Sequence, residues 1–473
     1  MSTASAAVPA SDRMPPEGRK ALIGAWIGFF VDMFDIYLPI IALAPAAAYF
    51  EASDVSPGTA AIIGGMIFAA TLIGRPVGAF VFGHLGDKIG RRRTAITAVT
   101  GFGIITLGIA ALPGYEAWGL GAVVLLIVLR FVDGIFLGGE YTSASPLALE
   151  YTPKRKRGLY GAFIMTGYPL AYCAIALITF GLLKALPADT LHSPYVQWGW
   201  RIPFIFGALI AFAFVIWYTK FVSESVAWEN APKTKSPLLE LFRGRNLRNF
   251  LQVFMMMTGI WLSLNMVSAV LPGLLAKPVG LGNTQVTVVL IISYAVLAFA
   301  YIGAGVLSQR IGRRPFFLLL GAVTGTLAPL VYGIIVGGVV QGLAGVVILT
   351  ILVNIFVVSV WGVVTTYINE RFHVGIRASG YGIGYSLAVI IPAFYAFYQA
   401  GLAGLMPIEF TPLVLLVIAG LLIAVGAALG PETREVDMAA SEAPEKAEPY
   451  AAVSAEEAPA DGGRTSPERP GIT

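Results

Sequence analysis

Charge, cysteine and histidine are all scarce in this chain. Only 12% of its 473 residues are charged, and it has one cysteine and three histidines. A soluble domain typically carries about 25% charged residues, so the composition excludes an ordinary soluble fold. Cys173 has no second cysteine to pair with, which excludes an intrachain disulfide. So few His and Cys side chains offer no metal-ligating cluster, and we expect neither a metal site nor a cofactor.

Motifs of catalysis and nucleotide binding are also missing. The chain has no H-E-x-x-H segment, no G-x-S-x-G segment and no Walker P-loop. We therefore expect that the protein is not an enzyme and that ATP is not its direct energy source. Nothing in the sequence leads us to expect a nucleic-acid partner.

Long apolar runs dominate the chain instead. Hydrophobic residues make up 57% of it, and the mean hydropathy is +0.78. A helix needs about 20 residues to cross a hydrocarbon core about 30 Å thick. We predict an all-α protein of the cell (plasma or inner) membrane with twelve transmembrane helices. The twelve runs lie near residues 21–48, 58–84, 94–112, 118–148, 158–183, 200–221, 248–274, 285–309, 315–338, 341–368, 378–401 and 411–429.

One ten-residue string occurs twice between these runs. Residues 83–92 read GHLGDKIGRR, and residues 305–314, almost half the chain later, read GVLSQRIGRR. Six of the ten positions are identical. A repeat at this offset indicates two related six-helix halves, and two related halves that meet at the bilayer midplane are typical of alternating-access transporters.

The basic residues predict the orientation. Most of the 31 Lys and Arg residues fall in the tails and in every second connection between runs. The positive-inside rule then places both termini in the cytoplasm. The predicted order is a cytoplasmic tail (1–20), a six-helix bundle (21–221), a cytoplasmic linker (222–247), a second six-helix bundle (248–429) and a disordered cytoplasmic tail (430–473), the last because it is rich in Ala, Glu, Pro and Ser.

The repeated string resembles the loop signature of the major facilitator superfamily, G-x-L-x-D-[RK]-x-G-R-[RK]. Other segments are similar to its metabolite:proton symporter branch, namely 75–78 (RPVG), 82–87 (FGHLGD), 138–140 (GGE) and 198–204 (WGWRIPF). Residues 224–225 (ES) and 431–433 (PET) fall where the superfamily has short acidic motifs. The resemblance covers residues 20 to about 433. It implies a transporter that works by alternating access, with a monomer as the default state.

The first run departs from this branch. Residues 28–35 read GFFVDMFD, where the branch usually has Asn after the Gly and then a Glu-Trp-Tyr-Asp run. The segment is also similar to the Asp-Gly-Phe-Asp pattern of aromatic-acid:proton symporters. The resemblance therefore implies substrates such as mono- or dicarboxylates, aromatic acids or zwitterionic osmolytes. Residues 161–169 lack the pattern of superfamily antiporters, which favours symport.

Ionisable residues deep in the runs are the main functional candidates, because a charge inside a membrane is costly. All of them lie in the first half of the chain. We predict proton coupling by the acids together with Arg130, and substrate binding by the two arginines, since a guanidinium pairs a carboxylate bidentately. These residues are Asp32, Asp35, Arg75, Arg130, Asp133 and Glu140.

Depth along each run predicts how these charges pair. At about 1.5 Å per residue from the cytoplasmic end, Arg75 should neighbour Asp32 or Glu140, and Arg130 should lie nearer Asp35. An acid beside an arginine that changes partner would bind and release a proton as the pairing changes. The alternative is a fixed ion pair that only joins helices. If the acids fully neutralise the arginines, a zwitterion or a neutral solute is favoured over a carboxylate.

The second half has no charge deep in a run but offers polar and aromatic side chains. We predict that several of these, together with Tyr37 of the first half, orient an organic substrate. The alternative is interhelical hydrogen bonding and anchoring at the membrane interface. The candidates are Trp261, Asn265, Tyr294, Asn354, Trp361 and Tyr385.

The repeated loops are predicted to gate the transporter. Glycines in the first copy allow tight turning, and by resemblance Asp87 closes the inward side by bonding the N-terminal end of a helix in the other half. The second copy has Gln309 at the matching position, so we expect a charged latch on one side only. The predicted gating residues are Gly83, Gly86, Asp87, Gly90, Arg91, Arg92, Gly312, Arg313 and Arg314.

The leading hypothesis is an importer of a small organic metabolite, foremost a carboxylate or related organic acid, by proton symport. Its partners would be the lipid bilayer, the solute and a proton. The alternatives are a carrier of a zwitterionic osmolyte or other metabolite, and a facilitator without proton coupling. A more remote alternative is a membrane sensor that no longer transports.

Overall fold

The computed structural model describes residues 14–52, 57–89, 91–222, 241–340, 342–372, 376–436 and 438, apart from a few side chains within the helices. In this part of the chain, twelve helices are long and apolar enough to cross a membrane. This confirms the predicted all-α fold with twelve spans. Residues 1–13 of the predicted N-terminal tail and most of the predicted linker and C-terminal tail lie outside the described residues. The first helix begins at Pro16, so residues 16–20 belong to a helix and not to a tail as predicted.

The first six spans run from Pro16 to Phe221. In chain order their elements are α1 (Pro16–Leu38) with η1 (Pro39–Leu43) and η2 (Ala44–Phe50), α2 (Pro57–Ile89), α3 (Arg91–Ala110), the short α4 (Tyr115–Trp118) and then α5 (Leu120–Glu150), η3 (Lys154–Lys156) with α6 (Arg157–Met165) and α7 (Gly167–Ala185), and η4 (Tyr195–Gly199) with α8 (Arg201–Phe221).

The last six spans run from Gly244 to Leu429. Their elements are α11 (Gly244–Asn265) with η5 (Met266–Val270) and α12 (Leu271–Ala276), α13 (Asn283–Ile311), α14 (Arg313–Gly325) with α15 (Leu327–Val336), α16 (Leu343–Val358) with α17 (Trp361–Arg371), α18 (Arg377–Ser386) with η6 (Leu387–Val389), α19 (Ile390–Ala393) and α20 (Tyr395–Leu402), and η7 (Ile408–Phe410) with α21 (Thr411–Leu429).

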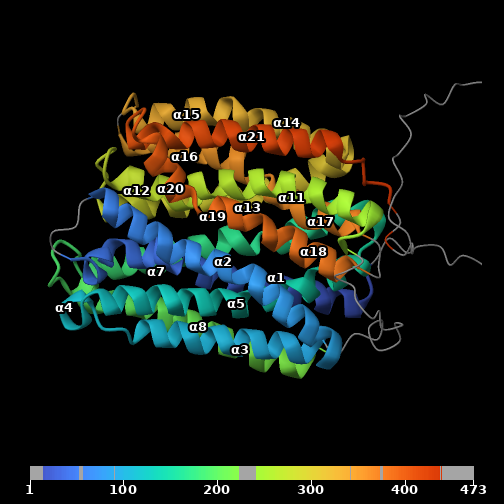
Figure 1. The fold of residues 1–473 in the computed structure, drawn as a ribbon, viewed down its shortest axis with the longest axis horizontal. Coiled ribbons are helices and arrows are strands. Elements are labelled where there is room, and N and C mark those ends of the chain that lie inside the picture. Colours follow the sequence, from blue (N-terminus) through green and yellow to red (C-terminus); the bar gives the residue numbers. More distant parts are fainter. Residues whose placement is uncertain are drawn as a thin grey trace, which may run out of the picture.

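The two sets of spans lie side by side. In Figure 1 the elements coloured blue to green gather in the lower part and those coloured yellow to red in the upper part, with α3 and α8 at one edge and α14, α15 and α21 at the other. Helices from both sets meet in the middle, where α7 packs on α13, α6 on α13 and α17, and α2 and α5 on α18. We call the end where α2 meets α3 and α13 meets α14 the loop end, and the opposite end the far end.

Many spans are broken near their middle. Span 1 passes into a π-helix at Pro39, and span 7 passes into one at Met266 before Pro272. Span 5 is interrupted at Thr166, and span 10 just before Trp361. Proline removes a backbone donor and disturbs the helical ladder. In transporters, interrupted helices of this kind commonly form the solute site near the middle of the membrane.

Small residues bring α2 and α5 into backbone contact. A Cβ atom at Gly74 or Gly78 would overlap backbone atoms of Phe131 or Ile135, and one at Gly134 would overlap the Thr71 carbonyl. Close approach through small residues is a common means of packing membrane helices. The crossing holds Arg75 of α2 and Arg130 of α5 in the same buried region.

Candidate functional site

A small apolar cavity lies between the two halves. Its free volume is only about 10 Å³, and it is lined by residues of six elements, from α1 to α18. Ligand pockets commonly measure roughly 300–1,000 Å³, so the halves must move apart to admit a solute. The lining residues are Phe29, Met33, Met165, Tyr168, Trp261, Leu264, Trp361 and Tyr385.

Three aromatic rings from the second half form one wall of this cavity. Trp261, Trp361 and Tyr385 pack edge to face, with ring centroids 4.6 to 5.6 Å apart. The Trp261 Nε1 donates to the backbone carbonyl of Tyr385 at 2.9 Å. The buried Trp361 Nε1, in contrast, has no hydrogen-bond partner in the part of the chain that the structure describes. Buried indole N–H groups usually find a partner, so Trp361 offers a free donor at the cavity.

Arg75 and Asp32 form a buried ion pair beside the same wall. The Arg75 Nη2 lies 2.9 Å from Asp32 Oδ2, and its Nη1 lies 3.3 Å from Oδ1, so the contact is bidentate. Both side chains are almost completely buried. The Arg75 guanidinium carbon lies 6.0 Å from the centroid of the Tyr385 ring. The pair thus lies next to the cavity, at the junction between the halves.

Arg130 occupies a second buried cluster. Its Nη1 lies 3.2 Å from Asp35 Oδ2 and 3.1 Å from Asp133 Oδ2, and its Nη2 donates to the carbonyls of Asp35 and Ile36. The Thr106 hydroxyl donates to the other oxygen of Asp35. Arg130, Asp35 and Asp133 are therefore a buried triad, and we use that name below.

The pairings expected from depth are both present. Arg75 lies against Asp32, and Arg130 lies against Asp35. The other partner considered for Arg75 was Glu140, whose side chain lies outside those described. Whether any of these residues couples a proton stays a prediction. In the described part of the chain, no group of three His, Cys, Asp or Glu side chains is arranged to hold a metal ion.

Four other substrate candidates are buried but do not line the cavity. The Asn265 Nδ2 donates to the Pro392 carbonyl, and the Asn354 Nδ2 donates to the Thr350 carbonyl of its own helix. Tyr37 and Tyr294 belong to a cluster of tyrosine rings described next. Their assignment to the substrate stays a prediction.

A cluster of tyrosines fills the space between the two halves, from the cavity toward the far end. The rings of Tyr172 (α7) and Tyr294 (α13) stack with centroids 3.7 Å apart. The Ser268 hydroxyl bonds the hydroxyls of Tyr168 and Tyr294 at 2.6 and 2.9 Å, and Tyr172 donates to the Ser268 carbonyl. Because α7 belongs to the first half and both partners to the second, this cluster joins the two halves. Sequence reasoning missed Tyr168, Tyr172 and Ser268, since no local pattern brings helices of opposite halves together.

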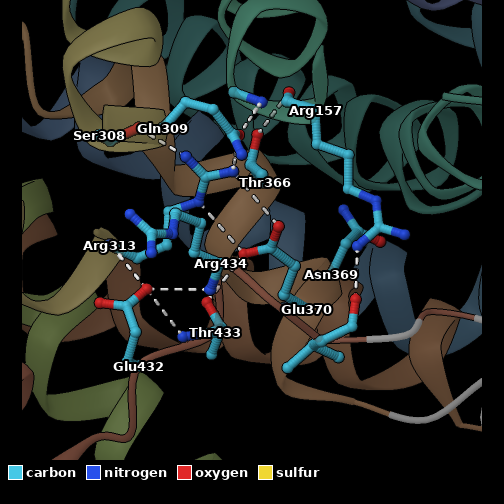
Figure 2. A network of polar contacts seen from close by, with 12 residues as sticks. Arg157, Ser308, Gln309, Arg313, Thr366, Asn369, Glu370, Glu432, Thr433 and Arg434 are labelled. Atoms are coloured by element: carbon cyan, nitrogen blue, oxygen red, sulfur yellow. Dashed lines mark hydrogen bonds and ion pairs between the residues drawn. The ribbon is translucent and has the colours of Figure 1, made fainter. Parts of the chain in front are cut away.

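A polar network fills the loop end. Figure 2 shows the Arg313 guanidinium pointing toward Glu370 on α17, at 3.2 Å, with Thr433 donating to the same carboxylate. The Glu432 carboxylate accepts from the backbone N–H groups of Arg313 and Arg314, at the N-terminus of α14. A helix N-terminus favours an anion. Glu370 was not among the predicted residues, because its burial at the end of an apolar run cannot be read from the sequence.

Gln309 makes, in the second copy, the kind of contact that the resemblance assigned to Asp87 in the first. Its Oε1 accepts from the backbone N–H of Gly158, near the N-terminal end of α6 in the other half, at 3.1 Å, and from Arg313 at 2.7 Å. In Figure 2 it lies between Arg313 and the α6 segment that begins at Arg157. The second copy of the repeated string therefore has a latch without charge.

The rest of the predicted gating set is described only in part. Arg92 donates to the Thr219 carbonyl. Gly312 has φ +102°, a conformation that side chains rarely adopt, and a Cβ there would meet the Glu432 carboxylate. Gly90 and the side-chain surroundings of Gly83, Gly86, Asp87 and Arg91 lie outside the described residues.

The segment after α21 contacts both halves at this end. Arg157 of α6 donates to the Val436 carbonyl, and Arg377 of α18 donates to the Met438 carbonyl. Lys154 bonds Glu435 at 3.1 Å and holds the pKa of that carboxyl below its usual value. Because this last pair is exposed, it contributes little to stability.

The comparisons with known proteins agree with these observations. The family model described as Major Facilitator Superfamily matches residues 25–269, and the model Sugar (and other) transporter matches residues 229–442. An inner membrane metabolite transport protein of Escherichia coli (strain K12) is 31% identical over 389 residues, which are 80% of this chain and 87% of that protein. The chain belongs to the major facilitator superfamily.

Other relatives cover most of the chain as well. A shikimate transporter of Escherichia coli (strain K12) is 28% identical over 87% of this chain and 94% of its own length. The solved structure of the Escherichia coli xylose transporter, in a partially occluded inward open conformation, aligns over 89% of this chain and 100% of its own, with 16% identity and a TM-score of 0.65. At that identity the likeness shows the fold alone. The protein is thus a membrane transporter of the metabolite and sugar class, and not an enzyme.

Proposed function

We propose that this protein imports a small organic acid together with a proton. The observation that carries the proposal is the bidentate pair of Arg75 and Asp32, buried beside an aromatic cavity between the halves. An ionisable pair inside a membrane protein is by default a functional candidate. The pair lies at the junction of the two halves, which is where a solute binds in alternating access.

The cavity favours a solute with an apolar face. Its walls are aromatic rings, methionine side chains and a leucine, with one unpartnered donor at Trp361 Nε1. A polyhydroxylated sugar would leave several hydroxyl groups without hydrogen bonds there, which is costly. A compact acid would place its apolar body against the rings and its carboxylate toward Arg75.

Proton coupling follows from competition for Arg75. Both terminal nitrogens of this guanidinium bond Asp32, so a solute carboxylate gains the same contact only when Asp32 releases it. Protonation of Asp32 removes the charge that holds Arg75. One proton would then accompany one carboxylate, and the net charge of the buried region would be the same in the empty and the loaded protein.

The neutralisation of Arg75 also supports a second candidate. A zwitterion would bring a carboxylate for Arg75 and a cationic group for Asp32, and it would need no proton to enter. Aromatic faces attract quaternary ammonium groups, and three rings wall this cavity. A betaine is therefore the runner-up substrate class.

The test uses the purified protein in liposomes with a pH dye outside. Shikimate, succinate, glycine betaine and D-xylose are added in turn. We expect external alkalinisation with one of the two acids, abolished by a proton carrier. Asp32→Asn should still exchange that labelled acid across the membrane without any pH change. Labelled uptake of every accepted solute without a pH change would refute proton symport, and uptake of D-xylose alone would refute the substrate class.

A further inference from the structure

Acids outnumber bases among the described side chains of the buried cluster. Asp32, Asp35 and Asp133 supply three carboxylates, and Arg75 and Arg130 supply two guanidiniums, all almost completely buried. Glu140 lies on α5 two helical turns from Asp133, and its side chain is not described. Because Glu140 is acidic, it could only increase the excess. One negative charge is thus left over in a region from which water is excluded, and such a charge is costly.

Asp133 is the acid whose charge is not satisfied. Both of its carboxylate oxygens are buried and have no hydrogen-bond partner among the side chains and backbone groups described. Its Oδ2 lies 3.1 Å from Arg130 Nη1, but the hydrogen bonds of that guanidinium go to the Asp35 carboxylate and to the carbonyls of Asp35 and Ile36. Asp32 and Asp35, in contrast, each accept at least two hydrogen bonds.

The groups that face Asp133 add to this imbalance. From α1 come the carboxylates of Asp35 and Asp32, and from α5 itself comes Arg130. On α2, Arg75 is bonded to Asp32 and is not among the charges that act on Asp133. From α3 the polar neighbour is Thr106, whose hydroxyl donates to Asp35 and not to Asp133. Two like charges and one shared cation disfavour a third ionised carboxylate.

We propose that Asp133 is a proton-binding site that must be occupied before the two halves close. While either end is open, water reaches the triad and can support an ionised Asp133. Closing expels that water, and a proton from the water is then retained as an O–H bond on Asp133. With that proton the region is neutral: Asp32 balances Arg75, and Asp35 balances Arg130.

This proton is distinct from the one that accompanies the solute. It stays on Asp133 whether the closed protein is empty or loaded, so it sets the pH range of transport and not the coupling ratio. Failure of proton symport would therefore leave the inference standing, and failure of the inference would leave symport standing. A structural ion pair between an ionised Asp133 and Arg130 is the opposing account.

The first test is infrared spectroscopy of the purified protein. At neutral pH the wild type should show a buried protonated carboxyl C=O band that Asp133→Asn lacks and Asp133→Glu shifts. Glu435→Gln, which changes an exposed acid outside the buried cluster, serves as the control and should keep the band. An identical protonated-carboxyl signal in wild type and Asp133→Asn would overturn the proposal. If Asp133→Asn does not fold, the shift in Asp133→Glu decides, because an unshifted band refutes the assignment.

The second test measures exchange of the labelled probe that the wild type accepts, among shikimate, succinate, glycine betaine and D-xylose. The exchange rate of each protein at higher pH is divided by its own rate at about pH 6. Both proteins share any fall that is due to Asp32, so the quantity compared is the ratio of their rates. Above the pKa of Asp133 the wild-type rate should fall about tenfold per pH unit relative to that of Asp133→Asn, because the protonated fraction of Asp133 falls by that factor. A parallel fall in both proteins would overturn the proposal.

Discussion

At the scale of single residues, Asp32 compensates the charge of the buried Arg75 guanidinium. Asp32→Asn leaves the charge of Arg75 without its bidentate partner. Removing one partner of a buried pair costs about 3–5 kcal/mol. We expect thermal unfolding in detergent to occur at a clearly lower temperature than in the wild type.

The same variant should regain stability from its substrate. A carboxylate that binds Arg75 replaces the lost partner, and a ligand that binds only the folded state stabilises it. Adding the transported acid should therefore raise the unfolding temperature of Asp32→Asn more than that of the wild type. The double variant Asp32→Asn, Arg75→Gln should lose this response. Equal unfolding temperatures for wild type and Asp32→Asn would contradict the account.

Trp361 and Trp261 form a matched pair for a second prediction. The Trp361 Nε1 has no hydrogen-bond partner among the described residues, whereas the Trp261 Nε1 donates to the Tyr385 carbonyl. Trp361→Phe should leave the unfolding temperature almost unchanged and weaken solute binding about 3- to 10-fold, the value of one hydrogen bond. Trp261→Phe should lower the unfolding temperature, because it leaves a buried carbonyl without its donor. Binding calorimetry measures the affinity for the solute, and thermal scans measure the unfolding temperature. Unchanged affinity in Trp361→Phe would exclude the Trp361 Nε1 as a hydrogen-bond donor to the solute.

At the scale of elements, glycines let helices of the two halves touch. A Cβ at Gly305 (α13) would overlap the carbonyl oxygen of Gly158 (α6) at the loop end. A Cβ at Gly65 (α2), toward the far end, would lie 2.8 Å from the Ala396 Cβ (α20). Both contacts join opposite halves, and both must part for a solute to enter or leave.

Bulky residues at these glycines should hold opposite ends open. Overpacking costs roughly 1–3 kcal/mol or more, and 1.4 kcal/mol shifts a two-state equilibrium tenfold. We expect Gly305→Trp to speed hydrogen–deuterium exchange in α6 and Gly65→Trp to speed it in α20, each without the other change. Both variants should stop transport. The same exchange pattern in the two variants would show that these contacts do not control separate gates.

The elements also show how far sequence patterns reach. Runs of apolar residues were enough to predict all twelve spans, because length and hydropathy are properties of each segment alone. The breaks at Met266 and before Trp361 were not predicted. The break before Trp361 has no proline beside it, so it depends on how the helix packs. Depth along a helix predicted the Arg75 and Arg130 pairings, because rise per residue is fixed.

At the scale of the whole molecule, contacts between the halves were beyond sequence reasoning. The Tyr172–Tyr294 stack and the Gln309–Gly158 bond join segments more than a hundred residues apart. The cavity lining was predicted only at Trp261, Trp361 and Tyr385, and Phe29, Met33 and Met165 carried no polar signal. Which wall residues face a cavity depends on helix rotation, and apolar runs without a polar face do not reveal it.

The central claim is that solute accumulation is driven by one proton per carboxylate. The most direct measurement loads liposomes with the wild-type protein, clamps the membrane voltage at zero and imposes a gradient of about one pH unit. The account predicts that the labelled acid accumulates about tenfold on the alkaline side, because one proton supplies about 1.4 kcal/mol. Equal concentrations on both sides would contradict it.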